Sequence, residues 1–248
     1  MPQPVGTLVK AMNVLDALGE SAPIGVLALS RRLQMDKSAV SRILTTFKSR
    51  DYVRVVEDGR YDLGLRLFEL GQTMQERMPF RETVIPHVDA IARETGETAF
   101  AVHYSQGQIA YLYDCVSTQD IRLGGRSGMR ASPWTHPAGK AILAHHDEES
   151  VLADLSSARR SQRKGLPAIE NFRRELSRVR KQGYADQRDE EKCLLAVPVL
   201  NETLHVSAAL MLGGPAFRMP PSRTKSLAKL LVQHAREVSR LLTWIAEP

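Results

Sequence analysis

Residues 36–63 have the sequence DKSAVSRILTTFKSRDYVRVVEDGRYDL, and this stretch decides the fold of the N-terminal part of the chain. Its first half is typical of an amphipathic helix, because apolar residues recur at helical spacing at Val40, Ile43, Leu44 and Phe47. Asp36 is a suitable N-cap for this helix. The second half is rich in β-branched and aromatic residues around Asp58-Gly59, a strong two-residue hairpin signal. We therefore predict a helix followed directly by a tight hairpin.

Two further helical patterns precede this stretch. From about Val5 to Leu18, the apolar residues Leu8, Met12 and Leu15 predict an amphipathic helix that uses them as its buried stripe. Residues 26–33 predict a second, shorter helix. Three helices and then a tight hairpin is the order of a winged helix-turn-helix, whose third helix enters the DNA major groove.

The outward face of the third helix has the chemistry that DNA contact requires. Its hydroxyl side chains let the backbone approach base edges, and Arg42 presents a planar fork that can bind guanine O6 and N7 together. Between Arg31 and Arg54 seven basic residues stand against two acidic ones, which suits contacts to phosphates. The predicted DNA-binding residues are Arg31, Arg32, Lys37, Ser38, Ser41, Arg42, Thr45, Lys48 and Arg60. An ordinary solvated helix face is the alternative, but the helix pair, the polar face and the basic hairpin would then coincide by chance.

The whole chain has the composition of a folded globular protein. It contains 248 residues, 43% hydrophobic and 25% charged, which favours two domains, and its net charge of +6 suggests a polyanionic partner. Its first residues lack the features of a secretion signal, and no stretch approaches the roughly 20 apolar residues of a membrane span. We therefore expect a cytoplasmic protein with no membrane partner, in which Cys115 and Cys193 remain thiols.

Beyond the hairpin, a helical pattern with Leu67, Leu70, Met74 and Met78 on one side runs to Pro79, which should end it. Helical and strand patterns then alternate, with strands expected at 98–104, 108–115, around 184, at 194–200 and at 205–212. The prediction is an α+β protein with a winged helix-turn-helix domain at 1–63, a linker helix at 64–79 and an α/β domain with an antiparallel sheet at 80–248. A second basic run, Arg159 to Lys181, is interpreted as the solvated side of a helix that buries Leu176 and Val179.

The chain resembles the IclR-type bacterial transcription regulators over essentially its whole length. The segment LALSRRLQMDKSAVSRILTTFKSRDYV, followed by DGRYDLGLRLFELG, is similar to the family's DNA-binding domain and linker. IRLGGRSGMRASPWTHPAGKAILA, RVRKQGYA, LLAVPV and GGPAFR resemble later family motifs in the correct order. The resemblance implies a dimer, often paired into tetramers, that binds a partly palindromic operator. It also implies a GAF-like effector-binding domain that accepts a small organic acid, often aromatic.

The resemblance implies effector-binding positions in this chain wherever its residues correspond to those of the family. Gly128 and Met129 match a segment whose backbone amides face the effector, with Trp134 and His136 just beyond. The family's Ser-x-Ser pair before Gly-Pro is replaced here by Met211-Leu212-Gly213, and its aspartate after Gly-Tyr-Ala aligns with Gln187. Leu194, Leu195 and Ala196 align with a pocket strand that typically begins with cysteine. Here Cys193 is displaced by one position, which leaves open the face to which it points. The expected effector residues are Gly128, Met129, Trp134, His136, Gln187, Cys193, Leu195, Met211 and Gly213.

These departures favour an aromatic or otherwise larger, less polar effector, because hydroxyl groups are lost and Met211 offers an adaptable wall. The alternative is that Met211 is ordinary core. No metal ligand set and no cofactor are expected, because adjacent histidines such as His145 and His146, taken to be exposed, seldom share one ion. A hydrolase using Cys193 and His136, or a sensor acting through protein partners, are the competing functions. The favoured mechanism is a population shift transmitted through the linker helix.

Overall fold

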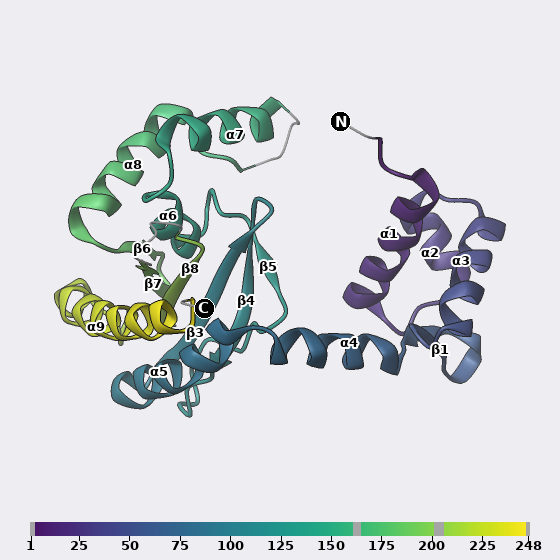
Figure 1. The fold of residues 1–248 in the computed structure, drawn as a ribbon, viewed down its shortest axis with the longest axis horizontal. Helices are drawn as coiled ribbons and strands as arrows, with labels where there is room; N and C mark the ends of the chain where they lie inside the picture. The colour runs from purple at the N-terminus through teal and green to yellow at the C-terminus, as the bar shows by residue number, and fades with distance from the viewer. Residues whose placement is uncertain (1–2, 161–164, 201–205, 247–248) are drawn as a thin grey trace. The chain divides into compact units, whose positions relative to one another are not determined.

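The helix and hairpin predicted from residues 36–63 form the centre of the first of two units in a computed structural model of the chain. The structure describes residues 3–160, 165–200 and 206–246. The chain divides into Met1–Arg77 and Met78–Pro248, so the linker helix belongs with the first unit rather than standing apart (Figure 1). The predicted α+β fold, with an N-terminal helix-turn-helix and an antiparallel sheet beyond it, is confirmed.

The first unit packs three helices against a two-stranded hairpin. Its elements are α1 (Gly6–Ser21), α2 (Val26–Leu33), α3 (Lys37–Ser49), β1 (Val53–Val55), the 3-10 turn η1 (Glu57–Gly59), β2 (Tyr61–Leu63) and α4 (Leu65–Glu76). Buried residues from the three helices and β1 form one small core, made of Val14, Ala17, Leu18, Leu29, Val40, Leu44 and Val53. Asp36 stands at the N-cap position of α3 in extended conformation, although its side chain makes no capping hydrogen bond.

The predicted buried stripe of α1 is wrong for Leu8 and Met12, whereas Leu15 packs partly buried against the core. Leu8 and Met12 are 58% and 57% exposed, whereas Val14 and Leu18 are fully buried. The buried residues all lie in the C-terminal half of the helix. Helical spacing indicates that an apolar face exists, but the neighbours of α1 decide which turns are covered. The apolar residues of its first turns therefore stay on the surface.

The hairpin turn follows its sequence signal closely. Asp58 and Gly59 both have positive φ, 61° and 67°, as a type I′ turn requires. The strands pair antiparallel from Val53 opposite Leu63 to Val55 opposite Tyr61. Asp58 tolerates this conformation better than most residues with a side chain, because its short polar group fits the left-handed region.

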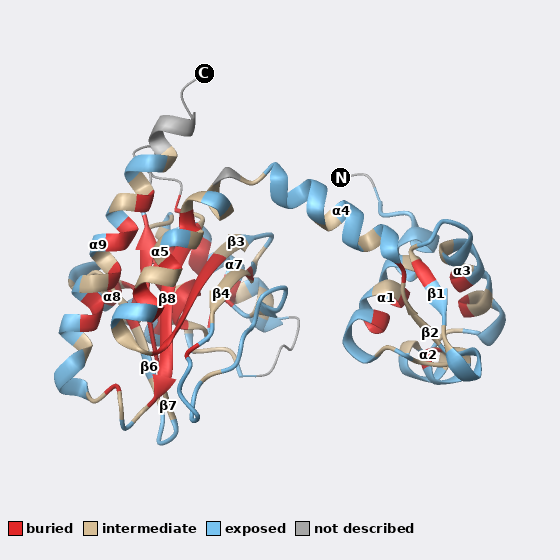
Figure 2. Cartoon of the chain, turned by 90° about the horizontal axis from the view of Figure 1, so that it is seen from below, coloured by how far each residue is buried: buried red, intermediate tan, exposed pale blue. Residues whose placement is uncertain are grey.

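A glycine fixes the point where the hairpin leads into α4. A Cβ added to Gly64 would lie 2.1 Å from the carbonyl oxygen of Asp51, so no other residue fits there without moving the backbone. The amide of Gly64 donates to the carbonyl of Tyr52, and the amide of Arg66 donates to that of Asp51. The start of α4 is thereby tied to the α3–β1 connection. The helix itself has no buried residue (Figure 2).

The second unit is built on a six-stranded antiparallel sheet in the order β5-β4-β3-β8-β7-β6. Its strands are β3 (Thr98–Ser105), β4 (Gln108–Cys115), β5 (Arg130–Ala131), β6 (Ala185–Arg188), β7 (Lys192–Val199) and β8 (Ala208–Pro215). The short edge strand β5 has no counterpart in the prediction. Its two residues, Arg130 and Ala131, pair with Ala110 and Ile109 of β4. Only this pairing with a distant segment makes them a strand, so local sequence does not predict it.

Helices cover both faces of this sheet. They are α5 (Pro79–Thr95), α6 (Pro137–Leu143), α7 (Glu148–Arg160), α8 (Ile169–Gln182) and α9 (Pro221–Ala246). One core cluster joins one face to α5 and α9, and a second joins the other face to α6, α7 and α8 (Figures 1 and 2). Pro79, predicted to stop the linker helix, begins α5, where its missing amide hydrogen costs nothing.

The second basic run belongs mostly to α8. This helix buries Phe172, Leu176 and Val179 and presents its arginines outward, as predicted for a solvated helix side. Arg163 and Lys164 of the same run lie outside the described residues. No helix among the described residues has the length and apolar content that a membrane crossing requires.

Candidate DNA-binding surface and effector site

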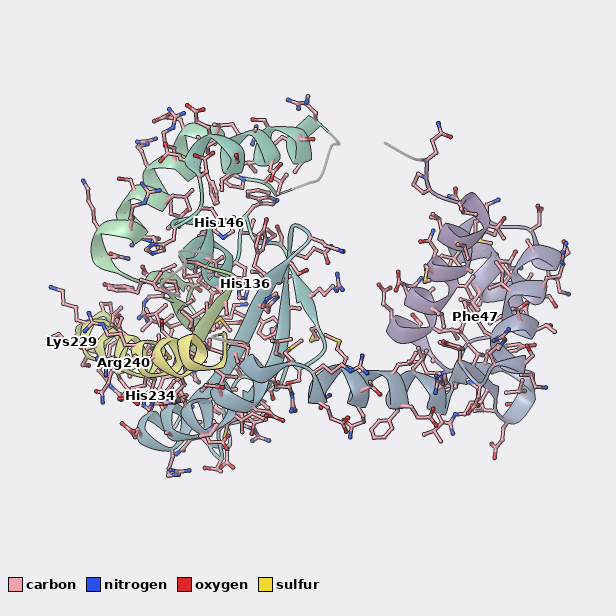
Figure 3. All side chains as sticks on the ribbon, viewed as in Figure 1. Phe47, His136, His146, Lys229, His234 and Arg240 are labelled. Atoms are coloured by element: carbon pink, nitrogen blue, oxygen red, sulfur yellow. The ribbon has the colours of Figure 1, made fainter. Side chains whose placement is uncertain are left out.

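The outward face of α3 is exposed as its sequence pattern predicts. Val40 and Leu44 are fully buried in the core, whereas Ser38, Arg42 and Thr45 are exposed on the other side. Phe47 packs at the edge of the core and contacts Tyr52 with ring centroids 6.1 Å apart (Figure 3). This packing holds α3 so that its polar face is free to meet another molecule.

The exposed cations of α3 are not neutralised within the described residues. No carboxylate of the described chain lies within ion-pair distance of Lys37, Arg42 or Lys48. The Thr45 hydroxyl donates to the carbonyl of Ser41 at 2.9 Å, which keeps its oxygen available as an acceptor. Ser41 itself is half-buried. Arg42 is exposed on the same side of α3 as Thr45.

Other predicted DNA-binding residues have partners inside the unit. Arg32 forms an ion pair with Glu20 and a hydrogen bond with Ser21, both at the end of α1. Arg60 lies 3.7 Å from the Asp58 carboxylate. Arg31 is exposed. Arg32 therefore serves the packing of α1 against α2 in this structure, a role that its sequence position does not indicate.

In the second unit, Tyr111 on β4 anchors the segment that carries Gly128 and Met129. Its amide donates to the carbonyl of Met129 at 3.0 Å, and its carbonyl accepts from the amide of Gly128 at 2.9 Å. Gly128 has φ of +84°. Both residues are exposed, so the predicted effector segment lies on the surface side of Tyr111.

An aspartate holds the glycine-rich part of the same segment. Asp114 Oδ1 accepts hydrogen bonds from the amides of Arg126 and Ser127 at 2.9 and 2.6 Å, and from the Ser127 hydroxyl. A Cβ on Gly125 would lie 2.6 Å from the other carboxylate oxygen, so glycine permits the close approach. Sequence reasoning missed Asp114, since a single aspartate in a strand pattern gives no local signal.

His136 connects the start of α6 to Tyr111. Its Nδ1 accepts from the amide of Ala138 at 3.3 Å, and its Nε2 lies 2.7 Å from the Tyr111 hydroxyl (Figure 3). Burial, with smaller effects of Arg126 and Lys140, lowers the pKa of His136 to about 4. The ring is therefore neutral at pH 7, and because Nδ1 accepts, Nε2 carries the proton and donates to Tyr111.

This arrangement gives Tyr111 a free donor. Its oxygen accepts from His136, and within the described residues no acceptor is in place for its own hydrogen. The side chain is almost completely buried, and burial raises the pKa of its hydroxyl, so the proton stays on the oxygen. A buried donor without a partner costs free energy, which a ligand acceptor would recover.

Aromatic and apolar side chains lie around this pair. Phe100 contacts Tyr111 edge-to-face with centroids 5.5 Å apart, and it pairs in register with Met211, which is fully buried. Trp134 packs edge-to-face on Phe172 at 5.7 Å. Trp134 also lines a cavity of about 350 Å³ that it shares with Tyr104.

Gly213 and Gln187 lie on one row across the sheet. Gln187 pairs with Leu194, Leu194 pairs with Gly213, and Gly213 pairs with Thr98. A Cβ on Gly213 would meet Leu194 at 2.8 Å and Leu123 at 3.0 Å, so apolar side chains fill the space that the glycine leaves. Gln187 is exposed on the edge strand.

The structure corrects the prediction for Cys193 and Leu195. Both side chains belong to the core beneath α5 and α9, on the opposite face of the sheet from Met211 and Trp134. Alternation along β7 causes this separation: Leu194 and Ala196 face one way, Cys193 and Leu195 the other. The hypothetical pairing of Cys193 with His136 in a hydrolase fails for the same reason. Burial also raises the pKa of the Cys193 thiol.

The expectation that His145 and His146 are exposed is wrong. Both are half-buried, and His146 Nε2 donates to the carbonyl of Val206 at 2.6 Å (Figure 3). Burial lowers the pKa of His145. The turn after α6 folds both rings inward, which adjacent positions in a sequence pattern do not reveal.

Comparison with known proteins gives a consistent result for both units. The family model described as the IclR helix-turn-helix domain matches residues 7–57, and the model described as the bacterial transcriptional regulator IclR C-terminal matches residues 72–240. The chain is 31% identical over 245 residues to the HTH-type transcriptional regulator KdgR of Escherichia coli, covering 96% of this chain and 93% of that protein. It is 28% identical to the transcriptional repressor IclR of the same organism, over 95% of this chain and 89% of that one.

Solved structures share the fold. An IclR transcriptional regulator from Alicyclobacillus acidocaldarius superposes with a TM-score of 0.82 at 22% identity, covering 96% of this chain and 99% of the other. An IclR homologue from Microbacterium hydrocarbonoxydans, complexed with 4-hydroxybenzoate, gives a TM-score of 0.78 at 20% identity, with coverage of 96% and 99%. The relatives are regulators rather than enzymes, as expected for this chain.

Proposed function

The chain belongs to the IclR family of DNA-binding bacterial transcription regulators, and from this premise we propose that it binds a partly palindromic operator as a dimer, under the control of a small aromatic acid bound in its second unit. The observation that carries the proposal is the exposed face of α3, where Ser38, Arg42 and Thr45 lie opposite the buried residues Val40 and Leu44. Lys37 and Lys48 at the two ends of this face are placed for phosphate contacts.

Exposed apolar side chains of the first unit support self-association. Leu8 and Met12 on α1 are more than half exposed, and so are Leu65, Phe68 and Met74 on α4. Exposed apolar residues on a small unit favour burial against a partner, and a twofold copy doubles the number of base contacts. A dimer is therefore the form in which we expect the chain to bind its operator.

The environment of Tyr111 supports an aromatic acid as the effector. Its free hydroxyl hydrogen suits a carboxylate, and Phe100 and Met211 provide a wall for an aromatic ring. Trp134 and His136 remain predicted effector contacts. Gly128 and Met129, on the segment that pairs with the backbone of Tyr111, remain predicted contacts as well. The solved relative that holds 4-hydroxybenzoate supports the chemical class.

The proposed mechanism is a shift between two arrangements of a dimer. An effector that binds one arrangement more tightly would change how well both α3 helices fit their half-sites, with α4 joining the two units. Repression or activation then depends on where the operator lies relative to its promoter.

Selection of promoter fragments with purified protein tests operator binding. Arg42→Ala should lose sequence-specific retention, whereas Arg173→Ala on α8, which is also exposed, should not. Affinity should fall steeply with salt. If the wild-type chain shows no salt-dependent affinity for any duplex, a sensor that acts through protein partners becomes the better assignment.

Calorimetric titration tests the effector separately. Aromatic acids such as 4-hydroxybenzoate should bind, and two-carbon acids should bind at least about 10-fold more weakly, the equivalent of about 1.4 kcal/mol. Preference for the two-carbon acids would refute an aromatic effector while leaving DNA binding intact.

A further inference from the structure

Two histidines from distant parts of the chain meet between α5 and α9. The Nδ1 atoms of His87 and His234 are 3.0 Å apart. Glu237 follows His234 by one turn of α9, and its Oε2 lies 3.7 Å from His87 Nδ1. Among the described residues, these three side chains form a group whose potential ligand atoms all lie within 4.8 Å of one another. Figure 3 shows His234 on the side of α9 toward α5.

The spacing matches that of ligands around one ion. Zinc binds histidine nitrogen at about 2.0–2.1 Å, so two ligand atoms of a tetrahedral site lie roughly 3.3 Å apart. The separations of His87 Nδ1 from His234 Nδ1 and from Glu237 Oε2, 3.0 and 3.7 Å, lie on either side of this value, and all three ligand atoms lie within 4.8 Å of one another. Without an ion, only one hydrogen can lie between the two nitrogens, and the pair is limited to a single hydrogen bond.

The three donors are of the types that bind transition metals, two imidazole nitrogens and a carboxylate oxygen. Neutral imidazole and ionised carboxylate are the ligand forms of these residues. Glu94 Oε1 lies 3.7 Å from His234 Nε2, just beyond hydrogen-bond distance, and Glu94 is 53% exposed. A small movement of this side chain would let its carboxylate accept the other ring hydrogen and orient the imidazole.

The group is shielded but remains accessible. The side chains of His87 and His234 are 14% and 9% exposed, whereas that of Glu237 is 44% exposed. Glu237 also lines a surface groove of about 760 Å³, beside the basic residues Lys225, Lys229, Arg236 and Arg240. Solvent therefore reaches the group at Glu237, and water can complete the coordination of an ion there.

We propose that His87, His234 and Glu237 bind one divalent transition-metal ion of the zinc class, with the remaining coordination position left to water. Two imidazoles and one carboxylate suit zinc and its neighbours better than magnesium or calcium, which prefer oxygen ligands. The ion ties the first helix of the second unit to its last helix. The ion should bind to this site in the absence of both DNA and effector.

The test uses the full-length chain without an affinity tag, freed of metal with a chelator. Titration with Zn²⁺ should give one ion per chain, and Co²⁺ should give the absorption of a site without thiolate ligands. His87→Gln should weaken binding at least about 100-fold, and Glu94→Gln about 10-fold, since loss of an orienting partner costs 10–100-fold. His146→Gln and Cys115→Ser, which alter other potential ligands, should bind as the wild type does.

Thermal unfolding distinguishes variants that have lost the metal site from variants that fail to fold. Zinc should raise the Tm of the wild type, because an ion that binds only the folded state stabilises it. Glu237→Gln changes an exposed side chain, so it should fold normally and show a much smaller rise. An absence of saturable binding, unchanged binding by both His87→Gln and Glu237→Gln, or loss of the site in His146→Gln or Cys115→Ser would overturn the proposal.

Discussion

The Nε2 atom of His136 donates to the hydroxyl of Tyr111 across 2.7 Å, and this bond leaves the tyrosine hydrogen directed elsewhere. Tyr111 is nearly fully buried, and its backbone also holds the segment around Gly128 and Met129. One side chain therefore joins β4, the start of α6 and the glycine-rich connection. The first prediction tests its role.

Tyr111→Phe should weaken effector binding by about 10-fold or more, because a hydrogen bond to a charged group contributes about 1.5–3 kcal/mol. Calorimetry with an aromatic acid measures this change. Tyr113→Phe is the matched control: Tyr113 donates to Asp89 on the other face of the sheet, so the effector affinity should stay as in the wild type. Equal affinities for the two variants would exclude Tyr111 as an effector contact.

His136 should make stability depend on pH. Its pKa is about 4 in the folded chain and about 6.5 when unfolded, so below pH 6.5 the unfolded state takes up a proton that the folded state resists. The stabilising contribution is complete above pH 6.5 and is lost as the pH falls toward 4. Its full size is on the order of 3 kcal/mol.

Urea unfolding of the wild type and His136→Gln at several pH values measures this contribution. Burial also lowers the pKa of His87, His103 and His145, so the difference between the two proteins is the informative quantity. That difference should shrink between pH 6.5 and 4. A constant difference over this window would contradict the assignment of a neutral, buried His136.

Gly64→Ala should destabilise the first unit by about 1–3 kcal/mol, the usual cost of forcing extra volume into packed structure. The added Cβ would lie 2.1 Å from a backbone carbonyl oxygen, which cannot rotate away. Gly71→Ala provides the contrast, because a Cβ there meets nothing within 4 Å and the position is inside α4. It should stabilise by up to about 1 kcal/mol.

Chemical denaturation, followed by a signal from the first unit, measures the free energy of unfolding of the Gly64→Ala and Gly71→Ala variants. Equal behaviour of the two alanine variants would mean that the junction between the hairpin and α4 adapts easily.

The ion pair of Glu97 and Arg218 should matter more than any exposed pair. Arg218 donates from Nε at 2.6 Å and from a terminal nitrogen at 2.8 Å to the two oxygens of Glu97, which is 2% exposed. Arg218→Ala leaves a buried carboxylate unpaired, which should cost about 3 kcal/mol or more. Asp62→Ala removes the pair with Arg54, which is 63% exposed, and a hydrogen bond from the Leu63 amide, and should cost only about 1 kcal/mol.

Denaturant midpoints of the two variants provide the comparison. Should Arg218→Ala cost no more than Asp62→Ala, the Glu97 carboxylate must reach water once its partner is gone.

Local sequence was sufficient for the elements that depend on neighbouring residues. The apolar spacing in α3 predicted its buried face, and Asp58-Gly59 predicted a two-residue hairpin turn, in which both residues have positive φ. Both signals act over a few positions, and over that range sterics and helical geometry determine the backbone conformation. The outward position of Arg42 followed from the same spacing.

The effector region was only partly predictable. Trp134, His136 and Met211 lie on one side of the sheet as the family resemblance implied, but Cys193 and Leu195 lie on the other. A one-residue displacement along a strand reverses the face, and only the pairing of β7 with its neighbours sets that register. Tyr111 and Asp114 had no local signal, because their partners are 12 to 25 positions away.

Sequence by itself determined the family, the order of the elements and the polar face of α3, since these arise from short-range patterns and from motifs in order. Tertiary structure alone decided which turns of α1 are covered, which face each strand residue occupies, and that His87 meets a histidine 147 positions later. The physical reason is that burial and side-chain contact depend on how separate elements pack. Periodicity within one element does not carry that information.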